Sequence, residues 1–139
     1  MESGSRWAPF GPSSSPPDAP TPSPAARIPA RRLAVVTCMD ARVDPLRALG
    51  LQLGDAHVIR NAGGLVNEDV LRSLALSHEL AGTTTAVIVA HSDCVAQGCD
   101  DDGARAAARD GVERLRAAIP ALEVSGVFYD LAGGRVSPL

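Results

Sequence analysis

Two cysteines and one histidine have the residue types and the placement that a zinc site needs. Cys38, His91 and Cys94 each come just after a short apolar run that is typical of a buried strand. Zinc binds thiolates and imidazoles, and three protein ligands with one open position are usual where water must be activated or substrate admitted. The pattern therefore indicates a zinc site, although a cysteine at a strand end is more often a small packed hydrophobe.

The segments that must position these residues alternate between strand and helix patterns. Residues 33–37 and 85–90 are short, apolar and rich in β-branched residues, as in strands buried on both faces of a parallel sheet. Such alternation predicts an α/β fold with a mostly parallel sheet flanked by helices. The other predicted elements are a short helix from Asp44-Pro45 to Gly50, a strand over 56–60, a helix capped by Asn67 and running to Leu80, a helix over 104–118, a strand over 124–131 and an antiparallel return at 135–136.

The strand ends explain how distant residues can share one site. In open α/β sheets, ligands gather in the crevice outside the carboxyl ends of the strands. His91 and Cys94 are close enough in sequence to ligate one ion from a tight turn, and Cys38 arrives from another strand. We therefore expect the three side chains to converge at one edge of the sheet.

Composition divides the chain into two parts. Residues 1–30 contain eight of the eleven prolines and many serines, with almost no apolar periodicity, so they are predicted to form a disordered tail. Residues 31–139 are long enough for one domain with a core of moderate size.

Several classes of protein find no support in the composition. The start of the chain has no secretory signal, and the longest apolar run, about 86–90, is much too short to cross a bilayer, so we expect a cytoplasmic protein without membrane contact. The three cysteines then argue for metal binding, catalysis or core packing rather than a disulfide framework. A net charge of −3, few aromatic residues and no basic stripe argue against nucleic-acid binding.

Three short blocks follow one another along the chain: Cys38-Met39-Asp40-Ala41-Arg42, Arg60-Asn61-Ala62-Gly63-Gly64 and His91-Ser92-Asp93-Cys94. In this order they resemble the sequence blocks of the β-carbonic anhydrase family. The resemblance is close from about residue 33 to 94 and implies a sheet of order 2-1-3-4 with an antiparallel edge strand. It also implies a zinc lyase of the carbonate dehydratase type, which hydrates carbon dioxide to bicarbonate and a proton and assembles as a homodimer or higher homo-oligomer.

The same resemblance implies roles for individual residues. Cys38, His91 and Cys94 would bind the zinc ion, which lowers the pKa of bound water from about 16 towards 7. Asp40 would orient the resulting hydroxide, and Arg42 would hold Asp40 by a charge-assisted pair. In some family members the aspartate instead becomes the fourth zinc ligand.

The resemblance also places a substrate pocket beside the zinc site. Gly63 and Gly64 would border this pocket and Val66 would supply part of its apolar wall. The residues themselves leave alternatives open, because the two glycines could form a simple turn and Val66 could belong to the core.

Two departures from the family pattern keep other functions open. Val95 stands where the family has a glycine, and the stretch from Cys94 to the last strand is shorter than is typical. If the backbone at Val95 needed a positive φ angle, a β-branched residue would be strained there. The alternatives are a carbonyl sulfide or carbon disulfide hydrolase on the same fold, and a noncatalytic, zinc-stabilised regulatory or interaction protein.

Overall fold

The structure, a computed structural model, describes residues 27–139. Most of the predicted tail, residues 1–26, lies outside the described residues, so the division at residue 30 stays a prediction. Within the described part, the N–H of Ala30 donates to the carbonyl of Gly54 at 2.8 Å. Pro29 is buried.

A single five-stranded sheet forms the centre of the fold. Its order is β2-β1-β3-β4-β5, and only β5 runs antiparallel to its neighbour, β4. The predicted order 2-1-3-4 with an antiparallel edge strand is confirmed. The strands are β1 (Leu33–Cys38), β2 (Ala56–Asn61), β3 (Thr85–His91), β4 (Glu123–Asp130) and β5 (Arg135–Pro138).

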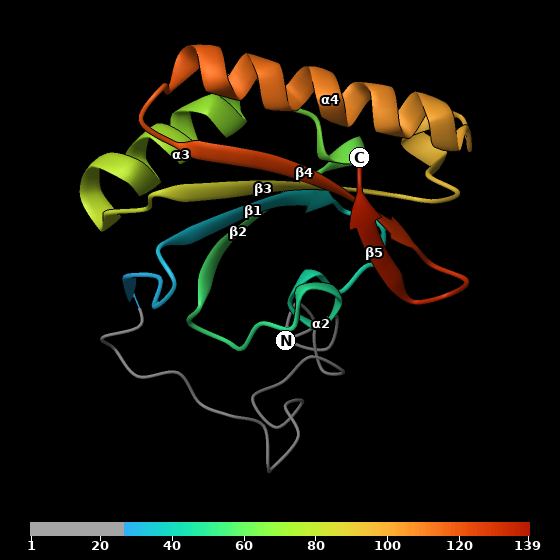
Figure 1. Cartoon of the computed structure of the whole chain (residues 1–139), viewed down its shortest axis with the longest axis horizontal. Coiled ribbons are helices and arrows are strands. Elements are labelled where there is room, and N and C mark those ends of the chain that lie inside the picture. The colour runs from blue at the N-terminus through green and yellow to red at the C-terminus, as the bar shows by residue number, and fades with distance from the viewer. Residues whose placement is uncertain (1–26) are drawn as a thin grey trace, which may run out of the picture.

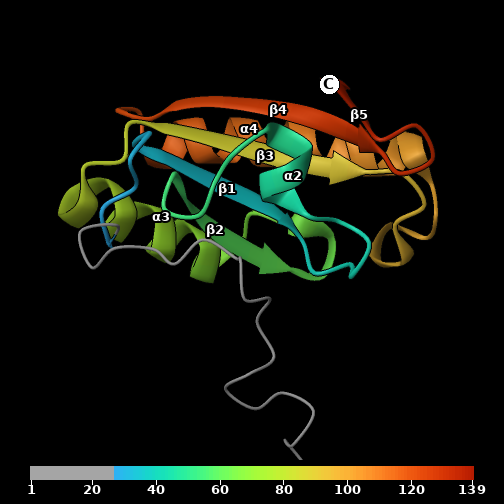
Figure 2. The same ribbon diagram turned by 90° about the horizontal axis from the view of Figure 1, so that it is seen from below.

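Helices cover both faces of this sheet. Helices α3 and α4 lie together on one face, and the short helix α2 lies on the other (Figure 1). The view from below shows α2 in front of the strands and α4 behind them (Figure 2). The α-helices are α2 (Pro45–Leu49), α3 (Glu68–Ala81) and α4 (Asp101–Ala118), and the 3-10 turns are η3 (Ala62–Gly64) and η4 (Val95–Gln97).

Side-chain caps set where the helices begin. The Asn67 side chain accepts a hydrogen bond from the N–H of Val70 at 2.9 Å, as predicted for the N-cap of α3. Helix α4 begins at Asp101 rather than at residue 104, because Asp100 accepts a hydrogen bond from the N–H of Asp102 and caps the helix earlier. Two acidic residues in that first turn also complement the positive end of the helix.

The core lies between the sheet and the two long helices. Leu74 of α3 and Leu115 of α4 are fully buried against alternate residues of the strands. The parallel register of β1 and β3 pairs Thr37 with Val89, so Cys38 and His91, at the ends of these two strands, lie at one edge of the sheet. Among residues 27–139, no helix is long and apolar enough to span a membrane, and the cytoplasmic location stays a prediction.

Candidate metal centre

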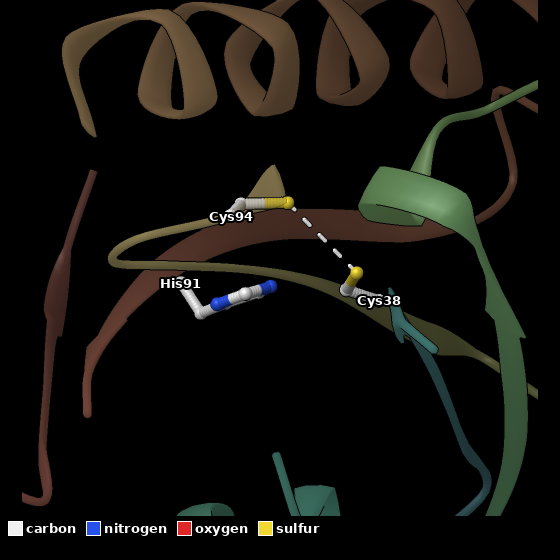
Figure 3. A group of neighbouring side chains, drawn as sticks. All are labelled: Cys38, His91 and Cys94. Carbon is white, nitrogen blue, oxygen red and sulfur yellow. Dashed lines mark hydrogen bonds between the residues drawn. The ribbon is translucent and has the colours of Figure 1, made fainter. Parts of the chain in front are cut away.

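Cys38, His91 and Cys94 converge at the carboxyl edge of the sheet, as the sequence predicts. One ligand atom from each residue lies within 4.8 Å of the other two, and the two sulfur atoms are 3.9 Å apart. Figure 3 shows the two sulfur atoms and the edge of the His91 ring directed towards one another. All three residues are buried, with exposed fractions of 4%, 1% and 2%.

The hydrogen bonds of His91 leave its second ring nitrogen free to bind a metal. Nδ1 lies 2.8 Å from the carbonyl oxygen of Ser92, which can only accept, so Nδ1 carries the proton in the neutral ring. Nε2 is buried and has no hydrogen-bond partner among the described residues. A buried polar atom without a partner is costly, and a metal ion would remove that cost.

The donor set fits a divalent metal ion. With zinc–sulfur bonds of about 2.3 Å and a tetrahedral angle, two thiolates on one ion lie about 3.8 Å apart. The observed sulfur–sulfur distance of 3.9 Å matches this value and is far too long for a disulfide. Burial raises the pKa of the Cys94 thiol, so a bound cation is needed to stabilise the thiolate form.

A carboxylate–guanidinium pair stands beside the three ligands. Arg42 donates to both oxygens of Asp40, from Nε at 3.0 Å and from Nη2 at 2.7 Å. The backbone N–H of Arg42 donates to the same carboxylate at 2.8 Å. These hydrogen bonds hold the pKa of Asp40 well below its usual range, so Asp40 is an ionised acceptor at neutral pH. Its Oδ2 lies 3.9 Å from Nε2 of His91, next to the metal centre.

Arg60 holds the loop that carries Cys38 and Asp40, a role that the sequence did not reveal. Its guanidinium donates to three backbone carbonyls of that loop, those of Cys38, Asp40 and Val43, at 2.8–2.9 Å. The N–H of Gly63 adds a hydrogen bond to Sγ of Cys38 at 3.3 Å. Arg60 and Gly63, both in the second sequence block, therefore hold Cys38 and its loop in place by hydrogen bonds.

Comparison with known proteins agrees with this geometry. The family model for carbonic anhydrases matches residues 33–121. Beta-carbonic anhydrase 1 of Mycobacterium tuberculosis is 37% identical over 143 residues, with 85% of each chain covered. This chain belongs to the β-carbonic anhydrase family.

Two further relatives of the β-carbonic anhydrase fold bear on the function. The crystal structure of a carbonic anhydrase from Streptococcus mutans superposes with a TM-score of 0.73 at 36% identity, covering 80% of this chain and 82% of that one. A carbon disulfide hydrolase from an Acidianus species is 50% identical over 64 residues, which cover 46% of this chain and 31% of that protein.

Gly64, in the second family block, lies against the backbone of β1. Its φ angle is +61°, and a Cβ atom there would lie 2.9 Å from the carbonyl carbon of Thr37. Gly64 therefore fixes the approach of η3 to the strand that ends in Cys38. Close backbone contact and left-handed conformation both favour glycine at this position.

Gly64→Ala is expected to lower the free energy of unfolding by about 2–4 kcal/mol. The added methyl group would clash with the backbone of β1, and alanine is also unfavourable at this positive φ angle. Gly50→Ala is the matched control. Gly50 has a similar φ of +68° but nothing within 4 Å of the place where an added methyl group would lie, so about 1 kcal/mol is expected. Urea denaturation of both variants measures the difference, and equal losses would contradict the close-contact explanation.

An apolar depression of about 530 Å³ opens beside the metal centre. Gly63, Gly64 and Val66 do not line it. Val66 is 6% exposed and packs in the core, where it faces Gly111 of α4. The role of these three residues in a substrate pocket stays a prediction. The residues that line the depression are Cys38, Met39, Asp40, Ala41, Ala62, Val95 and Ala96.

The other residues of chemical interest lie in ordinary structural settings. His57 contacts the Ser77 hydroxyl at 2.7 Å, and His78 contacts the carbonyl of Thr83 at 2.7 Å. Cys99 differs from these two histidines: it is exposed, precedes the cap of α4, has a φ angle of +58° and hydrogen-bonds the side chain of Asp93. Val95 is not among the positive-φ residues of the described part of the chain, so its β-branched side chain causes no strain of that kind.

Proposed function

We propose that this protein catalyses the reversible hydration of carbon dioxide to bicarbonate and a proton, with one zinc ion held by Cys38, His91 and Cys94. The observation that carries the proposal is the convergence of three buried ligand atoms beside an ionised carboxylate. When bound, zinc supplies the Lewis acidity that makes water a nucleophile near neutral pH.

Asp40 is the residue that we assign to orienting the attacking water. Because its carboxylate is ionised, it can only accept a hydrogen bond, and acceptance directs a lone pair of the water oxygen away from Asp40. Arg42 keeps both carboxylate oxygens in place through its paired hydrogen bonds. In this scheme Asp40 is catalytic, and Arg42 fixes its orientation.

The apolar depression supports a small, uncharged substrate. Met39, Ala41 and Val95 contribute side chains without hydrogen-bonding groups to its lining. Such a surface admits a linear triatomic molecule without competing for its oxygen atoms. We assign Gly63 and Gly64 to fixing the position of Cys38, through the hydrogen bond to its sulfur and the close contact with the backbone of β1. We assign Val66 to the core beneath the apolar depression.

Homodimerisation is part of the same proposal. The resemblance to the family implies it, and two large apolar side chains beside the metal centre support it. Met39 is 66% exposed and Val95 is 80% exposed in the single chain. Light scattering on the purified protein would measure the mass directly.

Hydrolysis of carbon disulfide or carbonyl sulfide is the second candidate. It is favoured by the match to the carbon disulfide hydrolase across 46% of this chain. The same ligands and the same apolar depression would serve it, since all three substrates are small, linear and uncharged. The two activities differ in product, because only the sulfur compounds release hydrogen sulfide.

One experiment separates the candidates. Stopped-flow carbon dioxide hydration and hydrogen sulfide release are measured on the same protein of known zinc content. The proposal expects hydration well above the buffer rate and little sulfide release. Efficient sulfide release with slow hydration would favour the hydrolase. Full zinc occupancy without either activity would favour the noncatalytic, zinc-stabilised alternative.

A further inference from the structure

Arg42 reaches beyond Asp40 to a second acidic residue in the loop between His91 and Cys94. Its Nη1 donates to Oδ2 of Asp93 at 3.1 Å, and its Nη2 donates to the backbone carbonyl of Asp93 at 2.9 Å. The guanidinium is therefore held from both sides, by Asp40 on one loop and by Asp93 on the other. Since each loop also carries metal ligands, Arg42 joins the two halves of the metal centre.

The backbone of Asp93 is held in an unusual conformation. Its φ angle is +54°, one of only three positive values among non-glycine residues of the described chain. Its N–H donates to the side chain of Asp101, in the first turn of α4, at 3.0 Å. Non-glycine residues in this region cost energy and persist where the surroundings require them, which is common at functional sites.

The conformation of Asp93 has a direct consequence for Arg42. It turns both the carboxylate and the carbonyl of Asp93 towards the same guanidinium. Arg42 is 50% exposed, so an arginine held at one end only would be free to move into solvent. With Asp93 in place, the plane of the guanidinium is fixed, and with it the plane of the Asp40 carboxylate.

We propose that Asp93 is a positioning residue: by anchoring Arg42, it keeps Asp40 beside the metal centre and out of the metal's coordination shell. The proposal deepens the proposed function and rests on it for the catalytic readout. Oδ2 of Asp40 lies 3.9 Å from Nε2 of His91, so a small rotation would bring it within ligand reach. Carboxylate oxygens are good zinc ligands, and an Asp40 released by Arg42 would take the open position.

Two substitutions at Asp93 test the proposal. Asp93→Gly removes the side chain and suits the positive φ angle, so the fold should be retained without loss of thermal stability. Asp93→Asn keeps an oxygen acceptor and also tolerates this conformation, so it should restore part of the contact with Arg42. The matched control is Asp102→Asn, which removes an exposed carboxylate paired with Arg105 at 3.4 Å.

The readouts are the visible absorption spectrum of the cobalt(II)-substituted proteins and their steady-state hydration kinetics. For Asp93→Gly we expect a changed cobalt spectrum, because the coordination shell gains a carboxylate, and a kcat about tenfold lower with an unchanged KM. Asp93→Asn should lie between this variant and wild type, and Asp102→Asn should match wild type in both readouts.

The two readouts distinguish failure of this inference from failure of the proposed function. If wild-type protein shows no hydration activity, the cobalt spectrum still reports whether Asp93 controls the coordination shell. A wild-type cobalt spectrum in folded Asp93→Gly would overturn the positioning role. A fall in thermal stability with an unchanged spectrum would overturn it as well, since that result assigns Asp93 a structural role only.

Discussion

Cys38→Ser is expected to lose its zinc and to hydrate carbon dioxide at least about 10³-fold more slowly than wild type. Cys38 is 4% exposed, and its sulfur faces that of Cys94 at 3.9 Å. A serine hydroxyl does not ionise near neutral pH and is a poor zinc ligand, so only one thiolate and one imidazole would remain. Metal analysis of the purified protein and stopped-flow hydration measure the two losses.

Cys99→Ser is the matched control for this experiment. Cys99 is a free, exposed cysteine outside the cluster of three ligands. Its side chain hydrogen-bonds Asp93, and a serine hydroxyl can keep that hydrogen bond. The control should keep about one zinc per chain and wild-type turnover, which shows that the loss follows from the ligand rather than from removing any thiol. Wild-type zinc content in Cys38→Ser would contradict the assigned ligand set.

Asp40→Ala is expected to keep its zinc and to lower kcat by about 10²-fold. The variant loses the ionised acceptor next to the metal centre, while the three ligand atoms stay in place. Because Asp40 is assigned to orienting the attacking water, the loss should appear in kcat rather than in zinc content. Stopped-flow kinetics on protein of measured zinc content provide the test.

Asp44→Ala controls for loss of a nearby carboxylate. Asp44 caps α2 by accepting a hydrogen bond from the N–H of Arg47 at 3.2 Å. Its removal should lower the stability by about 1 kcal/mol and leave kcat unchanged. An Asp40→Ala variant as active as this control would remove the orienting role of Asp40.

Much of the fold follows from local sequence patterns. The apolar run that ends at Cys38 is buried along almost its whole length, as its composition predicts for a central parallel strand. Because parallel strands end at one edge, their order alone brings Cys38 near His91 and Cys94. Strand ends and residue types therefore indicated the ligand cluster, and the strand order implied by the family resemblance placed the strand ends of Cys38 and His91 side by side.

The supporting contacts were not predictable in the same way. Arg60 binds carbonyls of a loop about twenty residues earlier in the chain, and no periodicity or local motif encodes that contact. Asp93 has a positive φ angle, and its N–H donates to Asp101, eight residues away. Such features arise from tertiary packing, which sets loop conformation after the strands and helices have been placed.

Val66 illustrates a similar limit. An apolar residue just after a glycine pair fits either a pocket wall or a core position, and sequence alone does not separate them. In the structure its side chain packs against Gly111 of α4, and burial leaves it 6% exposed. Because α4 covers Val66, the position of this helix on the sheet is what makes Val66 a core residue rather than part of a pocket wall.

X-ray absorption spectroscopy at the zinc edge is the most direct test of the central claim, that Cys38, His91 and Cys94 hold one zinc ion. We expect about one zinc per chain, with two sulfur ligands at about 2.3 Å and an imidazole nitrogen at about 2.0 Å. A zinc shell made only of nitrogen and oxygen, or protein that retains no zinc when purified in its presence, would contradict the claim.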